Sequence, residues 1–435
     1  MLDQFKNPPA RYRTIAFDAT DKPLLMREVK IEFDRMMVEA NLPASLKLPA
    51  AIGSTSPYFR LFMDYATRVR YALSLGRRKA QIALMRPSTQ QRSDFFEFYD
   101  SNLPMEHVSH DVIDEDAIVG ATVVDQSLIC SYSRYEMLIM PPMDAIRYET
   151  ALKIQEFVDD GGQVMAAMPV PTRDSQGKKH AEVESIFAEI FKSKSCEREP
   201  VVQTNNGAIL IKTYNPHELE DVLRNCICMA IKPEVSIKSD GRQCRDITFV
   251  HRTCKEAEIF FFANSSTTAH QVQLSIRCDK APHILDPETG EQIALTNCTQ
   301  QGNRTILLHN FEGCGSLLLY FDDEPSLAVP TPQSEYGQQI TIPDDWNIDD
   351  DHIDTVVYSR NVLIPEFLRG QRVIIKVDDQ PDIVEFIING AAAGTRLWPP
   401  YEMDITALVK PGINEITLKV MAALRPLGNT SINIY

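Results

Sequence analysis

Clusters of carboxylates are the side chains in this sequence best suited to acid–base chemistry. Two carboxyl groups about 5–10 Å apart, one with a raised pKa, can share the work of a general acid and a general base. A solvated or helix-capping role is the alternative, and it is favoured because runs of charge are usually exposed. The clusters are Asp111/Asp114/Glu115/Asp116, Asp286/Glu288/Glu291 in a turn, Asp344/Asp345, and Asp349/Asp350/Asp351/Asp354 in a loop expected to be solvated before a strand.

Motifs for metals and phosphates are incomplete. The stretch DDWNIDDDHID is dense in oxygen ligands but lacks the Gly and Glu positions of an EF-hand. Cys226 and Cys228 have no second Cys pair or His at zinc-finger spacing. Gly161–Gly162 does not extend into a phosphate-binding loop. We therefore expect no metal site and no cofactor.

Cys130 is the cysteine placed most like a nucleophile, since it follows the apolar run SLIC. A nucleophile elbow needs flanking glycines and a His partner, and neither GxSxG nor GxCxG occurs. His107 and His110 are near Cys130 only in sequence. We expect no catalytic role for Cys130.

Aromatic and amide groups near residue 400 have the chemistry of a sugar site. Sugars stack an apolar face on aromatic rings and hydrogen-bond to amides. Trp398 and Tyr401 flank two prolines in RLWPPY, and Asn389 begins an Asn-Gly turn. These three residues are our candidate carbohydrate-binding set. The alternative, which is favoured, is that the two rings pack the loop and that Asn389 serves only the turn.

Composition excludes more functions than it selects. The chain has 435 residues and a formal net charge of -16, which opposes binding to nucleic acid and to anionic membranes. Its nine cysteines include no CxxC, so free thiols in a reducing compartment are expected. The N-terminus lacks a signal peptide's apolar region, and no run of about 18 apolar residues predicts a membrane helix. The compartment stays unknown, and a neutral glycan is a compatible partner.

The first half of the chain alternates helical and strand patterns. Residues 1–57 are interpreted as an arm or the remnant of a preceding domain, with a helix near 24–40. Residues 58–75 place apolar side chains at three- and four-residue steps, which predicts a helix ended near Gly76. Short buried strands follow in AQIALMRP, EMLIMPP and QVMAAMPVP, with a helix in YETALKIQEFVDDGG. This order predicts a flavodoxin-like (amidotransferase-like) doubly wound α/β domain over 58–243.

From residue 244 the hydrophobic period becomes two. Residues 244–325 are predicted to form a small antiparallel β-sandwich, with DPETG as a tight turn. Residues 326–338 look like a linker rich in Pro, Ser and Gln. Residues 339–435 carry strand patterns about every 8–12 residues, which predicts a galactose-binding-like jelly roll. Because the chain stops within a strand-like phrase, we expect this module to be truncated.

The order of these phrases resembles the part of α-L-rhamnosidase-like glycoside hydrolases (family 106 and relatives) that follows the catalytic barrel. The resemblance covers about residues 58–435, and the last module is similar to the sugar-binding jelly roll of family 2 glycosidases. Each motif is weak alone, and their order makes the match more specific. The phrases are DYATRVRYALSLGRRKAQIALMRP, EMLIMPP, FVDDGGQVMAAMPVP, HRTCKEAEIFFFANSS, ILDPETGEQIAL, IINGAAAGTRLWPPYEMDIT and KPGINEITLKV.

The resemblance implies that the paired catalytic carboxylates of the family lie in a (β/α)₈ barrel ahead of the α/β domain. About 57 residues precede that domain here, and a barrel needs about 250. We therefore expect an accessory, non-catalytic part of a glycoside hydrolase that acts on plant-type or bacterial polysaccharide. A glycan and a catalytic barrel domain or subunit are the implied partners, and such relatives are often secreted or periplasmic. A free-standing carbohydrate-binding or structural protein, and an enzyme with an unrecognised site in the α/β domain, remain open alternatives.

Overall fold

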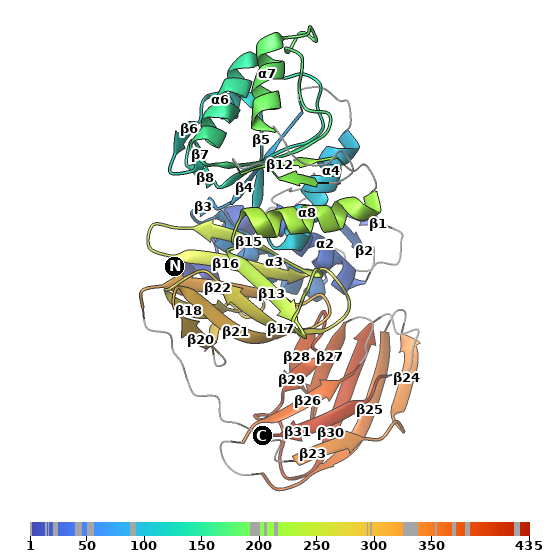
Figure 1. The fold of residues 1–435 in the computed structure, drawn as a ribbon. Coiled ribbons are helices and arrows are strands. Elements are labelled where there is room, and N and C mark those ends of the chain that lie inside the picture. Colours follow the sequence, from blue (N-terminus) through green and yellow to red (C-terminus); the bar gives the residue numbers. More distant parts are fainter. Residues whose placement is uncertain are drawn as a thin grey trace.

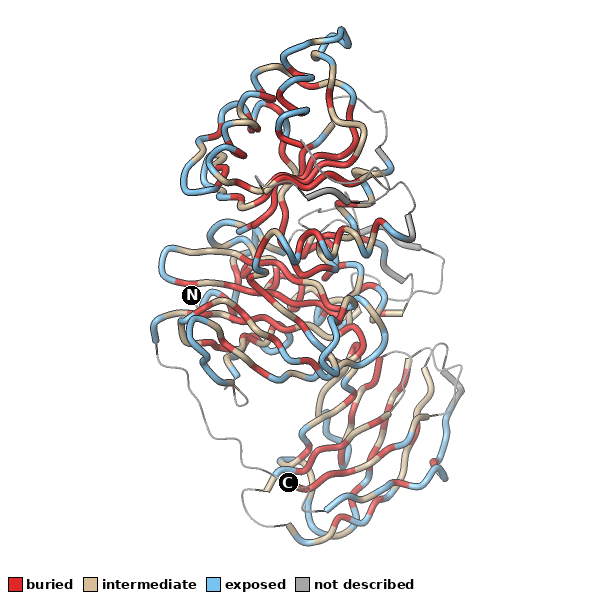
Figure 2. Tube along the Cα trace, viewed as in Figure 1, coloured by how far each residue is buried: buried red, intermediate tan, exposed pale blue. Residues whose placement is uncertain are grey.

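The computed structural model describes most of the chain, in an arrangement of stacked modules. Figure 1 shows the α/β domain at one end, a β-sandwich with the N-terminal helices in the middle, and a second β module at the other end. Buried residues concentrate inside each module (Figure 2). No helix among the described residues is long and apolar enough to cross a membrane. The described residues are 2–13, 15, 17–20, 25–39, 46–49, 56–87, 93–191, 201–203, 207–212, 216–293, 295, 298–324, 338–352, 355–367, 371–378, 383–421 and 427–435.

The N-terminal segment is a strand–helix–strand–helix unit. Strands β1 and β2 pair in parallel, with Phe17 opposite Leu46, and helix α2 connects them. The helix predicted near 24–40 is confirmed as α2, and the predicted apolar face of 58–75 is confirmed in α3, where Phe62 and Val69 are fully buried. The elements are α1 Leu2–Lys6, η1 Ala10–Arg13, β1 Phe17–Thr20, α2 Met26–Glu39, β2 Leu46–Pro49 and α3 Pro57–Ser74.

Helix α3 packs with α2 against the sandwich and not within the α/β domain, where its place in the sequence predicts it. Its buried residues share one apolar core with Phe33 of α2 and with Phe261 of the sandwich. The amphipathic pattern of a helix shows which of its faces is buried, but it does not show which surface of the protein covers that face. The pattern of α3 therefore fits either neighbour in the sequence. Ser56 caps its N-terminus and Pro57 occupies the first turn.

The α/β domain is a mostly parallel sheet covered on both faces. Its strand order is β11-β12-β10-β9-β4-β5, and all neighbours pair in parallel except β11 with β12. One face packs under α5, α6 and α7 and the other under α4 and α8. The elements are β4 Ile82–Met85, α4 Ser93–Asn102, η2 Leu103–Glu106, β5 His110–Ile113, α5 Glu115–Val119, β6 Thr122–Val124, β7 Ser127–Cys130, β8 Ser133–Tyr135, β9 Met137–Met140, α6 Tyr148–Asp159, β10 Gln163–Ala167, α7 Ala181–Ile190, β11 Val201–Gln203, β12 Ala208–Ile211 and α8 Pro216–Ala230.

The central module is a sandwich of two antiparallel sheets, ordered β14-β13-β17-β21-β20 and β19-β18-β22-β16-β15-β3. Strand β16 is buried on both faces, because Phe260 and Phe262 face the other sheet while Phe261 faces α2 and α3. The strands are β3 Arg77–Arg78, β13 Val235–Ser239, β14 Arg242–Gln243, β15 Ile247–Thr253, β16 Glu258–Asn264, β17 His270–Ile276, β18 Ala281–Leu285, β19 Gln292–Ile293, β20 Cys298–Gln301, β21 Arg304–Phe311 and β22 Ser316–Asp322.

The C-terminal module also stacks two antiparallel sheets, ordered β23-β31-β26-β29 and β24-β25-β30-β27-β28. Strand β31 is paired on both sides, with β23 and β26. The linker predicted over 326–338 lies outside the described residues except at Gln338. The strands are β23 Gln338–Ile342, β24 Asn347–His352, β25 Thr355–Ile364, β26 Val373–Val377, β27 Val384–Ile388, β28 Ala391–Arg396, β29 Glu402–Asp404, β30 Gly412–Met421 and β31 Thr430–Ile434.

One local expectation is wrong in this module. Asp349, expected in a solvated loop, lies on the edge strand β24, which pairs antiparallel with β25. Charged side chains on an edge strand discourage pairing with another chain, so a run of Asp is compatible with a strand there. The run of charged residues is more typical of a loop, so it did not predict the strand.

Candidate functional site

The turn that follows β18 is the point where three parts of the molecule meet. Asp286 shapes it, because its carboxylate accepts hydrogen bonds from the backbone N–H of Glu288 and the hydroxyl of Thr289, at 2.8 and 2.7 Å. Arg68 of α3 donates to the carbonyls of Pro287 and Glu288, at 2.9 and 2.6 Å. The turn predicted from DPETG is confirmed, and it is also a docking point for α3.

The C-terminal module reaches the same turn through the carboxylate of Glu288. Trp398 donates its indole Nε1–H to Oε1 at 2.7 Å, and Arg396 donates to Oε2 at 2.8 Å. The Trp398 ring meets Tyr65 of α3 edge-on, with 5.1 Å between ring centroids. Trp398 is only 4% exposed, so its ring closes the junction between modules.

A buried ion pair lies behind Trp398. Lys30 Nζ donates to Asp34 at 2.5 Å, to the Cys314 carbonyl at 2.8 Å and to Ser316 at 3.1 Å. Tyr65 donates to the second oxygen of Asp34 at 2.7 Å. Burial raises the pKa of Asp34, and Lys30 and Tyr65 act in the opposite direction. All three Lys30 protons are used, as a buried ammonium requires.

A cavity of about 260 Å³ opens at this junction. Helices α2 and α3 contribute Lys30 and Tyr65 to its walls, and the C-terminal module contributes Trp398. The end of β21 and the residues after it contribute His309, Asn310, Phe311 and Glu312. Burial lowers the pKa of His309 to about 4, so its imidazole is neutral near pH 7.

The three candidate carbohydrate-binding residues do not form one surface. Trp398 borders the junction cavity, whereas Tyr401 lies in the core of the C-terminal module and is 3% exposed. Asn389, at φ +52°, donates to the Leu408 carbonyl and accepts from the backbone N–H of Glu415, both at 2.9 Å. Its amide is thus engaged in holding the turn beside Gly390.

The acidic clusters have mostly structural partners. Asp114 caps α5 through the N–H of Ala117 at 2.9 Å, and the buried Glu115 accepts from Arg147 and Thr150. Asp345 is paired with Arg360. Asp354 lies outside the described residues. No group of three or more His, Cys, Asp or Glu side chains in the described part of the chain is arranged to hold a metal ion.

Cys130 lies on β7, and its thiol contacts the Ala117 carbonyl at 3.5 Å. Burial raises its pKa to about 11, so the thiolate is rare at neutral pH. His107 bonds to the Cys244 carbonyl at 2.8 Å and His110 to Asp100 at 2.7 Å. The structure does not bring these groups together as a nucleophile and base.

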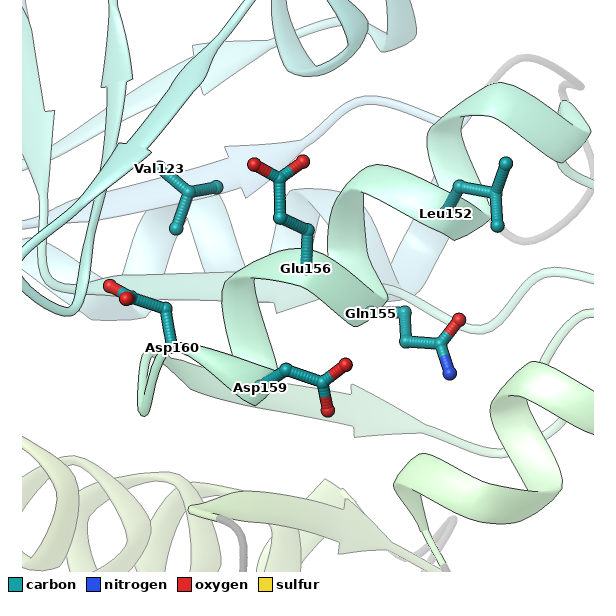
Figure 3. Close-up of a pocket in the computed structure, with 6 residues that line it drawn as sticks. All are labelled: Val123, Leu152, Gln155, Glu156, Asp159 and Asp160. Carbon is teal, nitrogen blue, oxygen red and sulfur yellow. The ribbon is translucent and has the colours of Figure 1, made fainter.

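A separate surface depression of about 450 Å³ runs along α6 (Figure 3). Val123 and Leu152 give it two apolar side chains, and Glu156, Asp159 and Asp160 give it acidic ones. Glu156 pairs with Lys153 and Asp160 accepts from the N–H of Gln126, both at 2.7 Å. These carboxylates serve the helix and the adjacent hairpin.

A buried histidine joins the α/β domain to the sandwich. His251 lies between two carboxylates, with Nδ1 at 2.9 Å from Glu234 and Nε2 at 2.7 Å from Glu258. Lys79 pairs with the other oxygen of Glu234 at 2.7 Å. The imidazole therefore lies between two hydrogen-bond acceptors. Lys79 and Glu234 lie where the chain enters and leaves the α/β domain.

Sequence reasoning missed the Lys30–Asp34–Tyr65 group. The i,i+4 spacing of Lys30 and Asp34 is the available signal, but that spacing normally marks an exposed pair on a helix surface. Glu288 was noted as part of an acidic cluster, without its partners Arg396 and Trp398.

Comparison with known proteins finds similarity to glycoside hydrolases. The family model described as alpha-L-rhamnosidase, glycoside hydrolase family 106, matches residues 54–297. A putative beta-glucuronidase of Formosa agariphila is 25% identical over 236 residues, which cover 53% of this chain and 18% of that protein. A rhamnosidase structure from Novosphingobium sp. PP1Y superposes with a TM-score of 0.63 at 15% identity, covering 94% of this chain and 46% of that one. The chain thus spans less than half of either relative.

Proposed function

Because the chain belongs to the α-L-rhamnosidase family of glycoside hydrolases, family 106, we propose that it is the non-catalytic, C-terminal part of such an enzyme. In this proposal it works attached to a (β/α) catalytic body, supplied by the same or another polypeptide. The substrate is a rhamnose-containing plant or bacterial polysaccharide. The limited coverage of both relatives supports this proposal, since each has a large part with no counterpart here.

The N-terminal unit is the observation that carries the proposal. Its order β1–α2–β2–α3, with parallel strands, is that of two successive repeats of a (β/α)₈ barrel. A parallel pair is not stable as a two-stranded sheet, because parallel strands occur in larger sheets covered on both faces. Among the described residues each of the two strands pairs only with the other. We infer that strands of the catalytic body extend this pair.

The finer fold assignments belong to the same proposal. The parallel strands of the α/β domain, numbered in chain order from β4, lie in the order 2-1-3-4-5, which supports a flavodoxin-like domain. The four- and five-stranded sheets of the C-terminal module support a galactose-binding-like jelly roll. We propose that this jelly roll helps to hold the glycan, with Trp398 at the junction cavity and with Tyr401 and Asn389 shaping the loops beside it.

The proposal is tested by hydrolysis of an aryl α-L-rhamnoside. We expect no turnover by the purified chain, and turnover when the (β/α) polypeptide of the intact enzyme is bound to it. Amide hydrogen exchange reports on the contact, since Asp18 and Lys47 lie mid-strand in β1 and β2. Their amides should exchange more slowly in the complex. Turnover by the chain alone, abolished by one carboxylate substitution within it, would contradict the proposal and favour an unrecognised active site.

A further inference from the structure

The junction cavity has walls from three parts of the molecule. Lys30 and Tyr65 come from the N-terminal helices, His309 and Glu312 from the sandwich, and Trp398 from the C-terminal module. Small-molecule sites occur preferentially where domains meet. A volume of about 260 Å³ is slightly below the usual range for drug-sized ligands, so one small ring is the size that fits.

Two polar side chains of this wall are available to a ligand. The side chains of His309 and Glu312 have no hydrogen-bond partner within the described ranges. Asn310 pairs across the sheet with the exposed Gln271, so its side chain lies on the opposite face of β21 from that of His309. By contrast, the side chains of Lys30, Tyr65 and Glu288 already form hydrogen bonds with other protein groups. The available set contains a neutral imidazole and a carboxylate, which together donate to and accept from hydroxyl groups.

Four apolar residues also line the cavity, namely Phe311, Trp398, Pro399 and Pro400. A ligand with hydroxyls around its edge and a C–H face matches this division, whereas an anion would meet the carboxylate of Glu312. A metal cation would meet the ammonium of Lys30, which also lines the cavity.

We propose that the junction cavity binds one uncharged sugar ring, a hexose or 6-deoxyhexose at a glycan terminus, through His309 and Glu312. The choice of L-rhamnose as the first probe rests on the proposed function. Binding there would also tie the C-terminal module to the sandwich, since both supply walls. In this proposal the sugar binds where the jelly roll meets the sandwich and the N-terminal helices.

Trp398 provides a direct reporter. The chain contains two tryptophans, Trp346 and Trp398, so Trp346→Phe leaves only the one at the cavity. Titration of this variant with L-rhamnose or methyl α-L-rhamnoside should change the emission of Trp398 saturably, with a Kd in the roughly millimolar range expected of a single sugar ring. Glycerol at the same concentration controls for solvent effects, and saturation-transfer NMR on the sugar gives a second readout.

Glu312→Ala is the discriminating variant, because the Glu312 side chain has no hydrogen-bond partner among the described residues and its loss should leave the fold intact. We expect its sugar affinity to fall about tenfold. Asn303→Ala, an exposed residue of the same hairpin, should bind as before. The inference is overturned if neither readout detects sugar up to about 100 times that Kd, or if Glu312→Ala binds unchanged. A negative result in this binding assay would not affect the prediction that hydrolysis requires the catalytic barrel. The two proposals can therefore fail independently.

Discussion

The indole N–H of Trp398 donates a 2.7 Å hydrogen bond to Glu288, a residue 110 positions earlier in the chain. Since Glu288 lies in the turn that also binds Arg68 of α3, one five-residue turn holds the N-terminal helices, the sandwich and the C-terminal module together. The turn thereby fixes the orientation of the three parts, which the proposed function requires for presenting a glycan to a catalytic body.

Removing the Glu288 carboxylate should loosen the C-terminal module. Glu288→Ala leaves the Trp398 N–H and Arg396 without their acceptor, so we expect the chain to lose about 2 kcal/mol in urea denaturation. Glu291→Ala is the matched control in the same turn, because its partner Lys6 is an exposed residue and such pairs contribute about 0–1 kcal/mol. Equal losses in the two variants would show that Glu288 is an ordinary surface residue.

Breaking the buried Lys30–Asp34 pair on α2 should lower the free energy of unfolding more than the loss of Glu288 does. Lys30→Met leaves Asp34 buried without its cation, so we expect a loss of about 3–5 kcal/mol. Arg35→Met on the same helix removes exposed pairs with Glu32 and Glu39 and should change stability by less than about 1 kcal/mol. Thermal or chemical unfolding of both variants measures the difference, and a small effect of Lys30→Met would mean that Asp34 is readily neutralised by protonation.

Local hydrophobic patterns in the sequence predict most of the helices and strands. The apolar runs that became β4, β9 and β10 are bounded by turn residues, and their predicted strands are confirmed. Helix α3 was predicted with the correct buried face, but its neighbour was not, because the periodicity of a helix identifies a face and not the surface that covers it.

The candidate site depended on contacts that sequence spacing does not reveal. The turn at Asp286 was predicted from Pro and Gly, whereas its bond to Trp398 joins modules that no local pattern connects. Lys30 and Asp34 carry the pattern of an exposed helix pair and are buried by a different module. The residues that line the junction cavity are therefore found only after the three parts are assembled.

Thiol reactivity should separate Cys130 from Cys228. Burial raises the pKa of Cys130 to about 11, while Cys228 is the exposed free cysteine among those described. With iodoacetamide at pH 8, we expect peptide mass spectrometry to find Cys228 alkylated well before Cys130. Fast modification of Cys130 would indicate an activated thiol and reopen the interpretation of this residue as a nucleophile.

Acid should weaken the connection between the α/β domain and the sandwich through Glu234. Burial alone would raise the pKa of this carboxyl, but His251 and Lys79 outweigh that effect and lower it to about 2. A lowered folded-state pKa contributes stability that is complete above the unfolded value near 4.5 and is lost as the pH falls toward 2. The contribution is on the order of 3 kcal/mol.

The stability difference between the wild-type chain and Glu234→Gln should therefore shrink as the pH falls from 5 to 3. Glu189→Gln, at an exposed position on α7, is the control and should follow the wild type. Urea midpoints measured across this range check the prediction, and a difference that stays constant with pH would mean that the Glu234 carboxylate is not stabilised by His251 and Lys79.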